Sequence, residues 1–541
     1  MQRIIFLFSI IYFLCFINFS FFRCQESIGI GYLSYYNLYF KDILNDTILG
    51  VSYERITSSF IKTKKSDTII IAVLDTPVDK NHEYLKEHIW VNSDEIPENG
   101  IDDDDNGYID DINGWNFLGN RFGENQIYSN MEFNRIRNKY LSKYSIEDFK
   151  KHETGIYKKT SKLLDSMLND SKEKQQYYTM MFNSCSQAQN VIKKYYKHYD
   201  YSINQLDSLK NIHPNDTTIQ SALLRFSNFK TYVGIDVISK NYKLYNNYVT
   251  ILEDENFNER LNIGDNVNDI DDKFYGNNQV NHNINLFVHG TLVSGAIVDF
   301  LKPLSNLDKS NLNFQIMPIS IANYGDTHDK DIAVAIRYAV DNGAKIINMS
   351  FGKTLSMRKD WVFEALQYAE KHDVLVVSSA GNNSSDLTKT NDYYPNDNEN
   401  NGLEVSSNFL LVGASNHQIN EKLVASFSNY GNIDVDIFAP GVDIYTTTVN
   451  NSYEFQSGTS MAASVTSSIA ALIRFYYPNL TASEVKQIIM ESGISLDIMV
   501  NKPSTKKEKE LVPFSSLSKS GKIVNAYNAL LMAEEVSKKK K

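Results

Sequence analysis

Gly458–Ala463 (GTSMAA) opens an apolar segment that continues to about Tyr476, just before Pro478. The many small residues of this segment predict a buried, tightly packed helix, with an extended segment at 453–456 ahead of it. Ser460 falls at the start of the helix, where free N–H groups and the helix dipole favour developing negative charge. A serine at this position usually only caps its helix, so the stretch indicates catalysis only if partner groups exist elsewhere.

Two other segments carry the residue types that a nucleophilic serine requires. Thr68–Leu74 (TIIIAVL) is a solid apolar run, typical of a strand buried on both faces, and Asp75 follows it. His289 precedes a helical run of small and apolar residues. Serine becomes a good nucleophile when a base takes its proton and a carboxylate orients that base. Asp75, His289 and Ser460 supply these three groups.

Strand patterns alternate with helical patterns along most of the chain. Buried strands are expected at 314–321, 345–349, 374–377, 409–412 and 435–438, and helices at 331–342, 361–371 and 481–493. Thr481 and Glu484 form a capping box at the start of the last of these helices. Gly290 and Gly295 would let the helix after His289 lie close to another backbone. The alternation predicts an α/β domain with a mostly parallel sheet flanked by helices.

The three segments together resemble the subtilisin-like serine peptidases (subtilases), over residues 68–529 apart from an insertion. The resemblance implies a subtilisin-like three-layer domain and endopeptidase activity on protein or peptide substrates. Asp75 would orient His289, and His289 would take the proton of Ser460. Asn382, which follows the strand at 374–377, would donate to the oxyanion together with the Ser460 backbone N–H. No cofactor is expected for catalysis.

Two segments resemble the substrate-binding regions of subtilases. The first is Asn348–Gly352, where Ser350, Phe351 and Gly352 would pair with an extended peptide through main-chain hydrogen bonds. The second contains Ala380 and Gly381, which stand directly before the oxyanion residue and are expected to contact the substrate as well.

Three positions depart from the family pattern without removing a catalytic group. Pro77, Leu292 and Ser464 stand where subtilases usually have Gly, His and Pro. They keep an alternative open, in which a catalytically weakened subtilase scaffold acts as a binding protein through its insertion. A calcium-dependent adhesin is a third hypothesis, and it depends only on an acidic loop and the insertion.

The acidic loop follows the first strand and has the spacing of a calcium-binding loop, with Gly107 at the sharp turn. The predicted ligands are Asp102, Asp104, Asn106, Asp110 and the backbone carbonyl of Tyr108. Asn113 occupies the position of the usual bidentate glutamate, so that ligand must come from elsewhere, and Asp111 is near. A solvated acidic loop is the alternative. Because carboxylates at this density repel one another, the sequence favours a structural calcium ion.

The N-terminus has the pattern of a targeting segment. Arg3 and the apolar run Ile4–Phe22 predict a secretory signal over residues 1–24, cleaved before Gln25. The run is also just long enough to span a bilayer, and Cys24 leaves lipidation open. Contact with a membrane is expected only through this segment, if it stays uncleaved or carries a lipid. We expect an exported protein that is periplasmic, cell-surface or extracellular.

The composition and the net charge exclude several other classes of protein. The 541 residues include only 25 Gly and 10 Pro, which excludes a collagen-like or low-complexity chain. The net charge of −11 argues against a nucleic-acid partner, because such binding needs a basic face. After signal cleavage Cys185 would be the one remaining thiol, so no internal disulfide is expected.

The expected domain organisation places an insertion inside the peptidase domain. In chain order we expect a signal peptide (1–24), an N-terminal segment (25–65), the first portion of the peptidase domain with the acidic loop (66–120), a polar and mainly helical insertion (121–279), the second portion of the peptidase domain (280–535) and a basic tail (536–541). Within the tail, the charge run Lys538–Lys541 is expected to be solvated and disordered.

Overall fold

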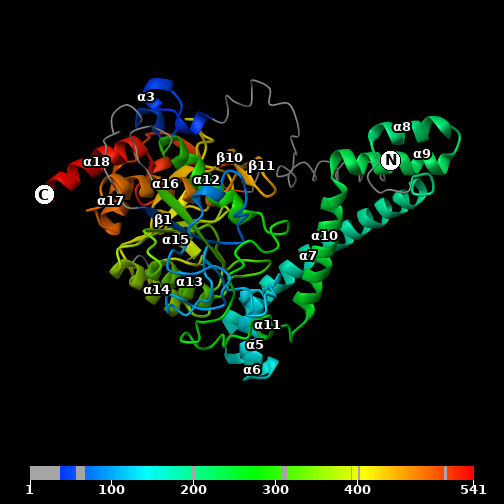
Figure 1. Ribbon diagram of the computed structural model, residues 1–541, viewed down its shortest axis with the longest axis horizontal. Helices are drawn as coiled ribbons and strands as arrows, with labels where there is room; N and C mark the ends of the chain where they lie inside the picture. The colour runs from blue at the N-terminus through cyan, green and yellow to red at the C-terminus, as the bar shows by residue number, and fades with distance from the viewer. Residues whose placement is uncertain are drawn as a thin grey trace. The chain divides into compact units, whose positions relative to one another are not determined.

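The structure is a computed structural model that describes residues 37–56, 68–152, 154–196, 201–305, 313–390, 393–399, 403–504 and 509–540. The predicted signal segment, 1–24, lies outside the described residues. The chain divides into two compact units (Figure 1). Asn130–Asn258 forms the smaller unit, and the rest of the chain forms the larger one.

A sheet of nine strands, counted over the described residues, lies at the centre of the larger unit. The strand order is β12-β15-β9-β8-β5-β4-β1-β3-β2, and its pairings are parallel except that of β12 with β15. The strands are β1 (Ile69–Asp75), β2 (Trp115–Asn116), β3 (Phe314–Ser320), β4 (Ile346–Met349), β5 (Leu375–Ser379), β8 (Phe409–Ser415), β9 (Ile437–Pro440), β12 (Ile494–Ser495) and β15 (Lys522–Ile523).

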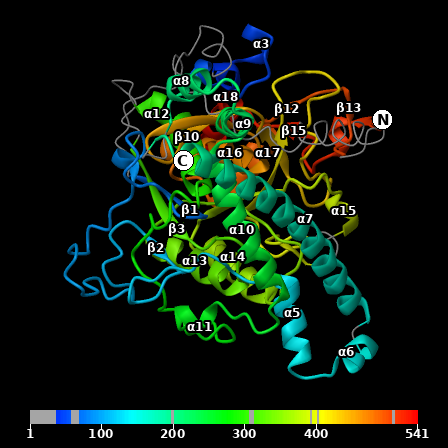
Figure 2. The ribbon, with the colours of Figure 1, turned by 90° about the vertical axis from the view of Figure 1, so that its right-hand side faces the viewer.

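Helices cover both faces of this sheet, as Figures 1 and 2 show. One face carries α12 (His289–Ser305), α16 (Thr459–Tyr476), α17 (Ala482–Ser492) and α18 (Ala526–Lys539), and the other carries α13 (Asp329–Asp341) and α14 (Lys359–Lys371). Ile71 and Val73 of β1 join the core on the first side, and Ala72 and Leu74 join the core on the second. Burial of both strand faces explains the solid apolar runs in the sequence. The three-layer α/β fold predicted from the sequence is confirmed.

Small residues let these helices approach neighbouring backbone closely. All of α16 is buried, as its small-residue composition predicted. A Cβ on Gly290 would lie 2.1 Å from the Thr76 carbonyl oxygen. A Cβ on Gly295 would lie 2.1 Å from Thr447 Oγ1 in β10 (Ile444–Thr448), which pairs with β11 (Ser452–Gln456). The helix that begins at His289 therefore passes close to neighbouring segments at two points.

Residues 37–56 belong to the same core. They form η1 (Asn37–Phe40), α3 (Ile43–Asp46) and η2 (Tyr53–Arg55). The Ala526 backbone N–H donates to the Val51 carbonyl at 2.9 Å, and the Arg55 guanidinium lies 3.9 Å from the Tyr527 ring centroid. This stretch of the predicted N-terminal segment thus packs against α18. Among the described residues, no helix combines the length and hydropathy needed to cross a membrane.

The expectation that the charge run Lys538–Lys541 is disordered is wrong for residues 538–540, which are the described part of that run. Helix α18 continues to Lys539. Lys538 pairs with Glu534 at 2.9 Å one helical turn earlier, and Lys540 pairs with Glu484 at 2.6 Å. Two lysines of the run thus have acidic partners, which favours the continuation of the helix.

The smaller unit is helical in its described residues. It contains α5 (Glu132–Leu141), α6 (Ile146–His152), α7 (Thr154–Ile192), α8 (Ile203–Ile212), α9 (Thr217–Tyr232) and α10 (Ile235–Glu253). The buried thiol of Cys185 lies in a core with Ile192, Leu223 and Phe226. The compact unit is shorter than the insertion predicted over 121–279, because the flanking residues pack with the larger unit. Trp115 Nε1, for example, donates to the Tyr275 carbonyl at 2.8 Å.

The larger unit contains further short elements. They are η3 (Lys86–His88), α11 (Arg260–Ile263), α15 (Leu387–Thr390), β6 (Asn398–Glu399), β7 (Leu403–Glu404), β13 (Met499–Asn501), β14 (Leu511–Pro513) and η4 (Phe514–Ser516).

Candidate active site

Asp75, His289 and Ser460 form one hydrogen-bonded chain. Asp75 ends β1, His289 begins α12, and Ser460 lies in the first turn of α16. His289 Nδ1 lies 2.8 Å from Asp75 Oδ1 and 3.0 Å from Oδ2. His289 Nε2 lies 3.1 Å from Ser460 Oγ. This arrangement can pass a proton from the hydroxyl to the imidazole while the carboxylate holds the ring.

The carboxylate of Asp75 is buried and oriented. Its side chain is 1% exposed, and Oδ1 also accepts from the Thr76 backbone N–H at 2.7 Å. Thr76 Oγ1 in turn accepts from the Gly290 N–H at 2.8 Å, which ties the end of β1 to the start of α12. The His289 side chain is 39% exposed and is therefore open to a ligand.

The environment of His289 favours its charged form. Desolvation lowers the pKa of His289, but the charge of Asp75 and the hydrogen bond to Asp75 outweigh it, and the pKa is raised above its usual value. An imidazole with a raised pKa is a stronger base once neutral, and the ion pair stabilises the imidazolium that proton transfer creates.

The Ser460 hydroxyl has two acceptors for its single proton. Besides His289 Nε2, the Ser350 carbonyl oxygen lies 3.1 Å from Ser460 Oγ. The Ser350 hydroxyl donates back to the Ser460 carbonyl at 3.2 Å and accepts from Asn348 Nδ2 at 2.9 Å. These contacts join the end of β4 to the start of α16. They therefore fix the position of the Ser460 hydroxyl relative to the predicted substrate strand.

Asn382 lies beside the same helix start. It follows β5 and is exposed, while Ala380 and Gly381 before it are buried. Asn382 Oδ1 accepts from the Thr459 N–H at 2.9 Å and from Thr459 Oγ1 at 3.0 Å. The Asn382 NH₂ group must then point away from Thr459. Asn429 braces this segment, because its Nδ2 donates to the Ala380 carbonyl at 2.8 Å.

A cavity of about 240 Å³ opens next to Asp75 and His289. Its other walls are the segment 322–327 and the strand end 350–353, which contains Ser350, Phe351 and Gly352. At the far end the buried Lys353 Nζ pairs with Asp329 at 2.8 Å and donates to the Thr327 carbonyl at 2.7 Å. A peptide chain lying along 350–352 would border this cavity.

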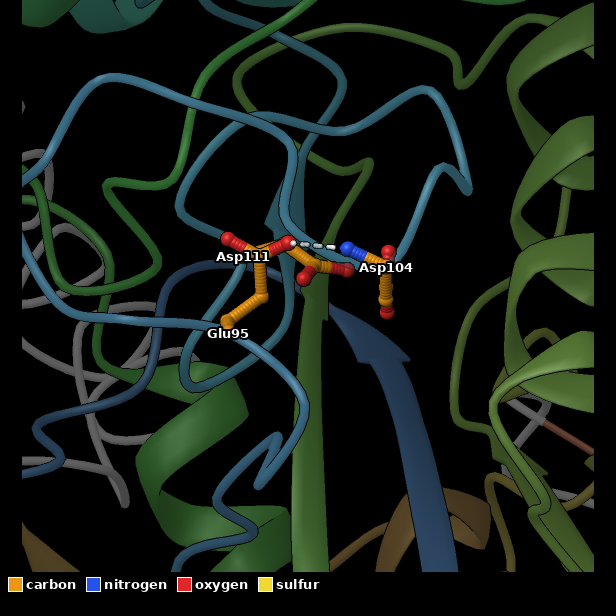
Figure 3. Close-up of side chains that lie close together, drawn as sticks. All are labelled: Glu95, Asp104 and Asp111. Atoms are coloured by element: carbon orange, nitrogen blue, oxygen red, sulfur yellow. Dashed lines mark hydrogen bonds between the residues drawn. The ribbon is translucent and has the colours of Figure 1, made fainter.

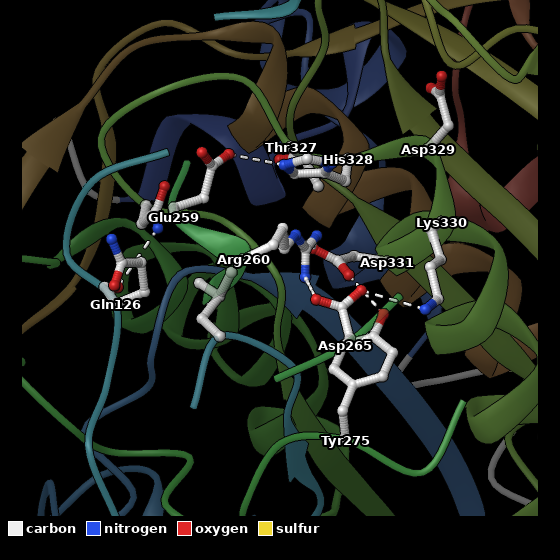
Figure 4. Close-up of polar contacts among 12 residues, drawn as sticks. Gln126, Glu259, Arg260, Asp265, Tyr275, Thr327, His328, Asp329, Lys330 and Asp331 are labelled. Carbon is white, nitrogen blue, oxygen red and sulfur yellow. Dashed lines mark hydrogen bonds and ion pairs between the residues drawn. The ribbon is translucent and has the colours of Figure 1, made fainter. Parts of the chain in front are cut away.

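Buried polar contacts and ion pairs hold the start of α13, which directly follows Thr327 and His328 (Figure 4). His328 Nε2 lies 2.7 Å from Glu259 Oε1, and Lys330 Nζ lies 3.1 Å from Asp265 Oδ2. Arg260 pairs with Asp331, whose other oxygen accepts from the Tyr275 hydroxyl. Removing one member of such a buried pair costs about 3–5 kcal/mol, so a substitution of one partner alone is expected to destabilise this wall of the cavity.

Pro77, Leu292 and Ser464, the three departures from the subtilase pattern, are accommodated by their surroundings. Pro77 is buried, and Leu292 belongs to the core at 4% exposure. The Ser464 hydroxyl donates to the Ser460 carbonyl one turn earlier at 3.0 Å. The hydrogen bonds between Asp75, His289 and Ser460 remain in place beside all three.

The acidic loop gathers a different set of carboxylates from the one predicted (Figure 3). Carboxylate oxygens of Glu95, Asp104 and Asp111 lie within 4.8 Å of one another. Of the predicted carboxylate ligands, Asp104 belongs to this cluster, and Asp111, which the sequence offered in place of the bidentate glutamate, joins it. Asp102 accepts from the Asn106 and Gly107 N–H groups, and Asp110 accepts from the Asn99 and Gly100 N–H groups, so both cap loop backbone.

Tyr108 and Asn106 also have structural contacts. Tyr108 packs its ring against Trp115 and Tyr338, and its backbone N–H donates to Asn106 Oδ1 at 2.8 Å. Asn106 Nδ2 donates to Asp104 at 3.0 Å and to Asp111 at 3.2 Å. The amide thus supports the cluster from one side.

Two members of the cluster are deeply buried. Asp111 is 0% exposed and accepts from the Tyr338 hydroxyl and from Asn92 Nδ2. Glu95 is 5% exposed, and its Oε2 has no hydrogen-bond partner among the described residues. Burial raises the pKa of both carboxyls, and their neighbouring negative charges add to the effect. A cation between these oxygens would satisfy the unpaired Oε2, so the residues fit a hard metal ion.

The fold and this site define an α/β protein with a serine, a histidine and an aspartate in hydrogen-bond contact at the carboxyl edge of a parallel sheet. The subtilase family profile matches residues 66–515, and the chain belongs to that family.

Three relatives illustrate the similarity. The thermophilic serine proteinase of Bacillus sp. (strain AK1) is 36% identical over 188 residues, 34% of this chain and 42% of that protein. The cell wall-associated protease of Bacillus subtilis (strain 168) is 31% identical over 209 residues, 38% of this chain and 21% of that protein. Subtilisin DY of Bacillus licheniformis is 30% identical over 209 residues, 38% of this chain and 71% of that protein. The matched region spans less than half of the first two relatives.

Proposed function

We propose that the protein is a serine endopeptidase that hydrolyses peptide bonds in protein or peptide substrates. The observation that carries the proposal is the chain of short contacts from Asp75 through His289 to Ser460, at 2.8 Å and 3.1 Å. Membership of the subtilase family and the names of the relatives support the same activity.

In the proposed reaction Ser460 Oγ attacks the scissile carbonyl while His289 Nε2 takes its proton. The Asn382 NH₂ group and the Ser460 backbone N–H donate to the oxygen on which negative charge develops. His289 then returns the proton to the leaving amine, which departs and leaves an acyl-enzyme. Water attacks this ester with His289 again as base, and the second product leaves. Asp75 holds the ring in place and stabilises the imidazolium.

The substrate would bind as an extended strand beside Ser350–Gly352. The cavity of about 240 Å³ next to this segment supports the proposal, since it offers room for side chains on the acyl side of the scissile bond. Main-chain hydrogen bonds would give affinity with little dependence on sequence, and the cavity would add preference.

We propose that the cluster of Glu95, Asp104 and Asp111 holds a structural calcium ion. Three carboxylates and nearby amide oxygens are the ligands that calcium prefers. The buried, unpaired Glu95 Oε2 supports this over a solvated acidic loop. The ion would stiffen the loop that connects β1 to β2 and take no part in proton transfer.

Export is proposed through the predicted signal segment at 1–24. The relative from Bacillus subtilis is named as cell wall-associated, which supports a location outside the cytoplasm. Immunoblots of cell fractions, with and without deletion of residues 2–24, would test it. Full-length protein that stays in the cytoplasmic fraction would contradict export.

A fluorophosphonate probe tests the activity, because it forms a covalent bond only with an activated serine. We expect wild-type protein to be labelled and to release peptides from casein. Ser460→Ala should show neither, and a Ser464→Ala variant, changed one helical turn away, should keep both. Folded wild-type protein that is neither labelled nor proteolytic would point instead to the scaffold alternative, in which the protein binds without cleaving.

A further inference from the structure

One aromatic ring stands between the two predicted substrate-binding segments. Strands β4 and β5 pair in parallel as far as Met349 and Ser378. Beyond that point the chain continues as Ser350–Gly352 from β4 and as Ala380–Asn382 from β5. Tyr393 is 7% exposed, its hydroxyl donates to the Ser379 carbonyl at 2.7 Å, and the Phe351 carbonyl lies 3.5 Å away. The hydroxyl is therefore anchored between the two strand ends.

The ring also touches the backbone of both segments. A Cβ on Gly352 would lie 2.2 Å from Tyr393 Cζ, and a Cβ on Gly381 would lie 2.6 Å from Tyr393 Cε2. Both distances are too short for a Cβ, because non-bonded carbon atoms pack at about 3.5–4.0 Å. Neither glycine could therefore be replaced by alanine without a shift of the ring. The tyrosine ring thus fills the space that separates Gly352 from Gly381.

The proposed reaction places a substrate residue over this same space. The attacked carbonyl carbon must lie at Ser460 Oγ, which is 3.1 Å from the Ser350 carbonyl. Its oxygen must face the NH₂ group of Asn382, whose orientation is set by Thr459. The residue that supplies this carbonyl therefore lies between 350–352 and 380–382. A long side chain on it, directed into the protein, would meet the Tyr393 ring.

A cavity lies on the other side of Ser350–Gly352, next to His289. The cavity beside His289 is lined by 322–327 and 350–353, and neither Gly381 nor Tyr393 is among its described lining residues. This cavity offers volume to the side chains of the substrate residues that precede the attacked one.

We infer that Tyr393 restricts the residue on the acyl side of the scissile bond to glycine, alanine or serine. The inference rests on the proposed endopeptidase function and specifies its substrate class. A phenylalanine or leucine at that position must displace a buried ring that holds a hydrogen bond to Ser379. A single methylene in a hydrophobic pocket changes kcat/KM between two substrates by roughly 10–200-fold. For a pocket that is already filled by a ring, we expect a discrimination at the upper end of this range.

The test uses full-length protein and tetrapeptide 4-nitroanilides that differ only at the residue before the cleaved bond. We expect kcat/KM for alanine to exceed that for phenylalanine by about 100-fold in the wild type. Tyr393→Ala should lower this ratio at least 10-fold by opening the gap. Tyr393→Phe keeps the ring, loses only the hydroxyl, and should retain the wild-type ratio. Fluorophosphonate titration gives the concentration of active sites in each preparation.

The possible outcomes distinguish a failure of the Tyr393 inference from a failure of the proposed endopeptidase activity. A wild type that cleaves the phenylalanine peptide as fast as the alanine peptide overturns the inference and leaves the peptidase intact. Absence of both labelling and cleavage overturns the proposed function itself. If Tyr393→Ala fails to fold, the wild-type ratio and Tyr393→Phe still decide, because a ratio near one in either contradicts the inference.

Discussion

The side-chain oxygen of Asn382 accepts two hydrogen bonds from Thr459, one from its backbone N–H at 2.9 Å and one from its hydroxyl at 3.0 Å. Thr459 directly precedes Ser460, so the same helix start positions the proposed nucleophile and orients the proposed oxyanion donor. The Thr459 hydroxyl also accepts from the Gly381 N–H at 3.0 Å, which fixes the segment that carries Asn382. Thr459 is a positioning residue that the sequence patterns did not single out.

Replacing Asn382 tests the proposed donor. Asn382→Ala should lower kcat by about 10²–10³ with little change in KM, because the lost hydrogen bond strengthens only as the oxyanion forms. Asn383→Ala, changed at the next exposed position, is the matched control and should stay near wild type. The measurement is steady-state hydrolysis of a peptide nitroanilide. A loss that appears wholly in KM would argue that Asn382 binds substrate instead.

Thr459 should act through Asn382. Thr459→Val removes the hydroxyl, and with it one hydrogen bond to Asn382 and the acceptor of the Gly381 N–H, but the hydrogen bond from the Thr459 backbone N–H to Asn382 remains. A neutral hydrogen bond contributes about 1 kcal/mol, so we expect a loss of about 5–10-fold in kcat. Thr459→Ser should restore the wild-type rate. In the Asn382→Ala background the Thr459→Val change should cost little more, and additive losses would contradict the coupling.

The pH dependence should follow the coupling between Asp75 and His289. His289 must be neutral to accept a proton, so kcat/KM rises with pH through the His289 pKa, which lies above its usual value because of Asp75. Asp75→Asn should lower kcat by roughly 10⁴ and move the acid limb of the profile to lower pH, since the charge that raises the pKa is gone. An acid limb that stays in place would contradict this assignment.

Calcium should stabilise the wild type through the acidic cluster. Free calcium at about 100 times its Kd would add about 2.7 kcal/mol to the free energy of unfolding, so EDTA should lower Tm. Glu95→Gln and Asp111→Asn should lose the response to calcium. Asp102→Asn, which alters only a loop cap, should keep it. If Asp102→Asn loses the stabilisation by calcium and Glu95→Gln keeps it, the ligands are those predicted from the sequence and not the cluster of Glu95, Asp104 and Asp111.

Gly295 should be intolerant of a methyl group. Gly295→Ala would press its Cβ against Thr447, where the gap is 2.1 Å, and should lower the free energy of unfolding by about 1–3 kcal/mol. Ser294→Ala is the neighbouring control, because the buried Ser294 hydroxyl has no partner among the described residues and its removal should cost little. Urea denaturation measures both. Equal stability of the two variants would contradict the close packing of α12 and β10.

Much of the fold could be predicted because its determinants are local. The apolar run before Asp75, the small-residue helix after Gly458 and the capping box at Thr481 each specify an element within a few residues, and the structure contains all three. Parallel strands bring their carboxyl ends to one edge of the sheet, so the motifs after β1, β4 and β5 had to converge. Boundaries were less accurate, since packing and pairing decide where an element ends.

Sequence patterns by themselves therefore predicted the fold class and singled out Asp75, His289 and Ser460, and the resemblance to subtilases added Asn382. Only the tertiary structure brought Glu95 to Asp111, set Thr459 against Asn382, and placed the ring of Tyr393 between Gly352 and Gly381. Each of these contacts joins segments that no local periodicity links, and distances of a few ångströms between such segments depend on how the whole core packs.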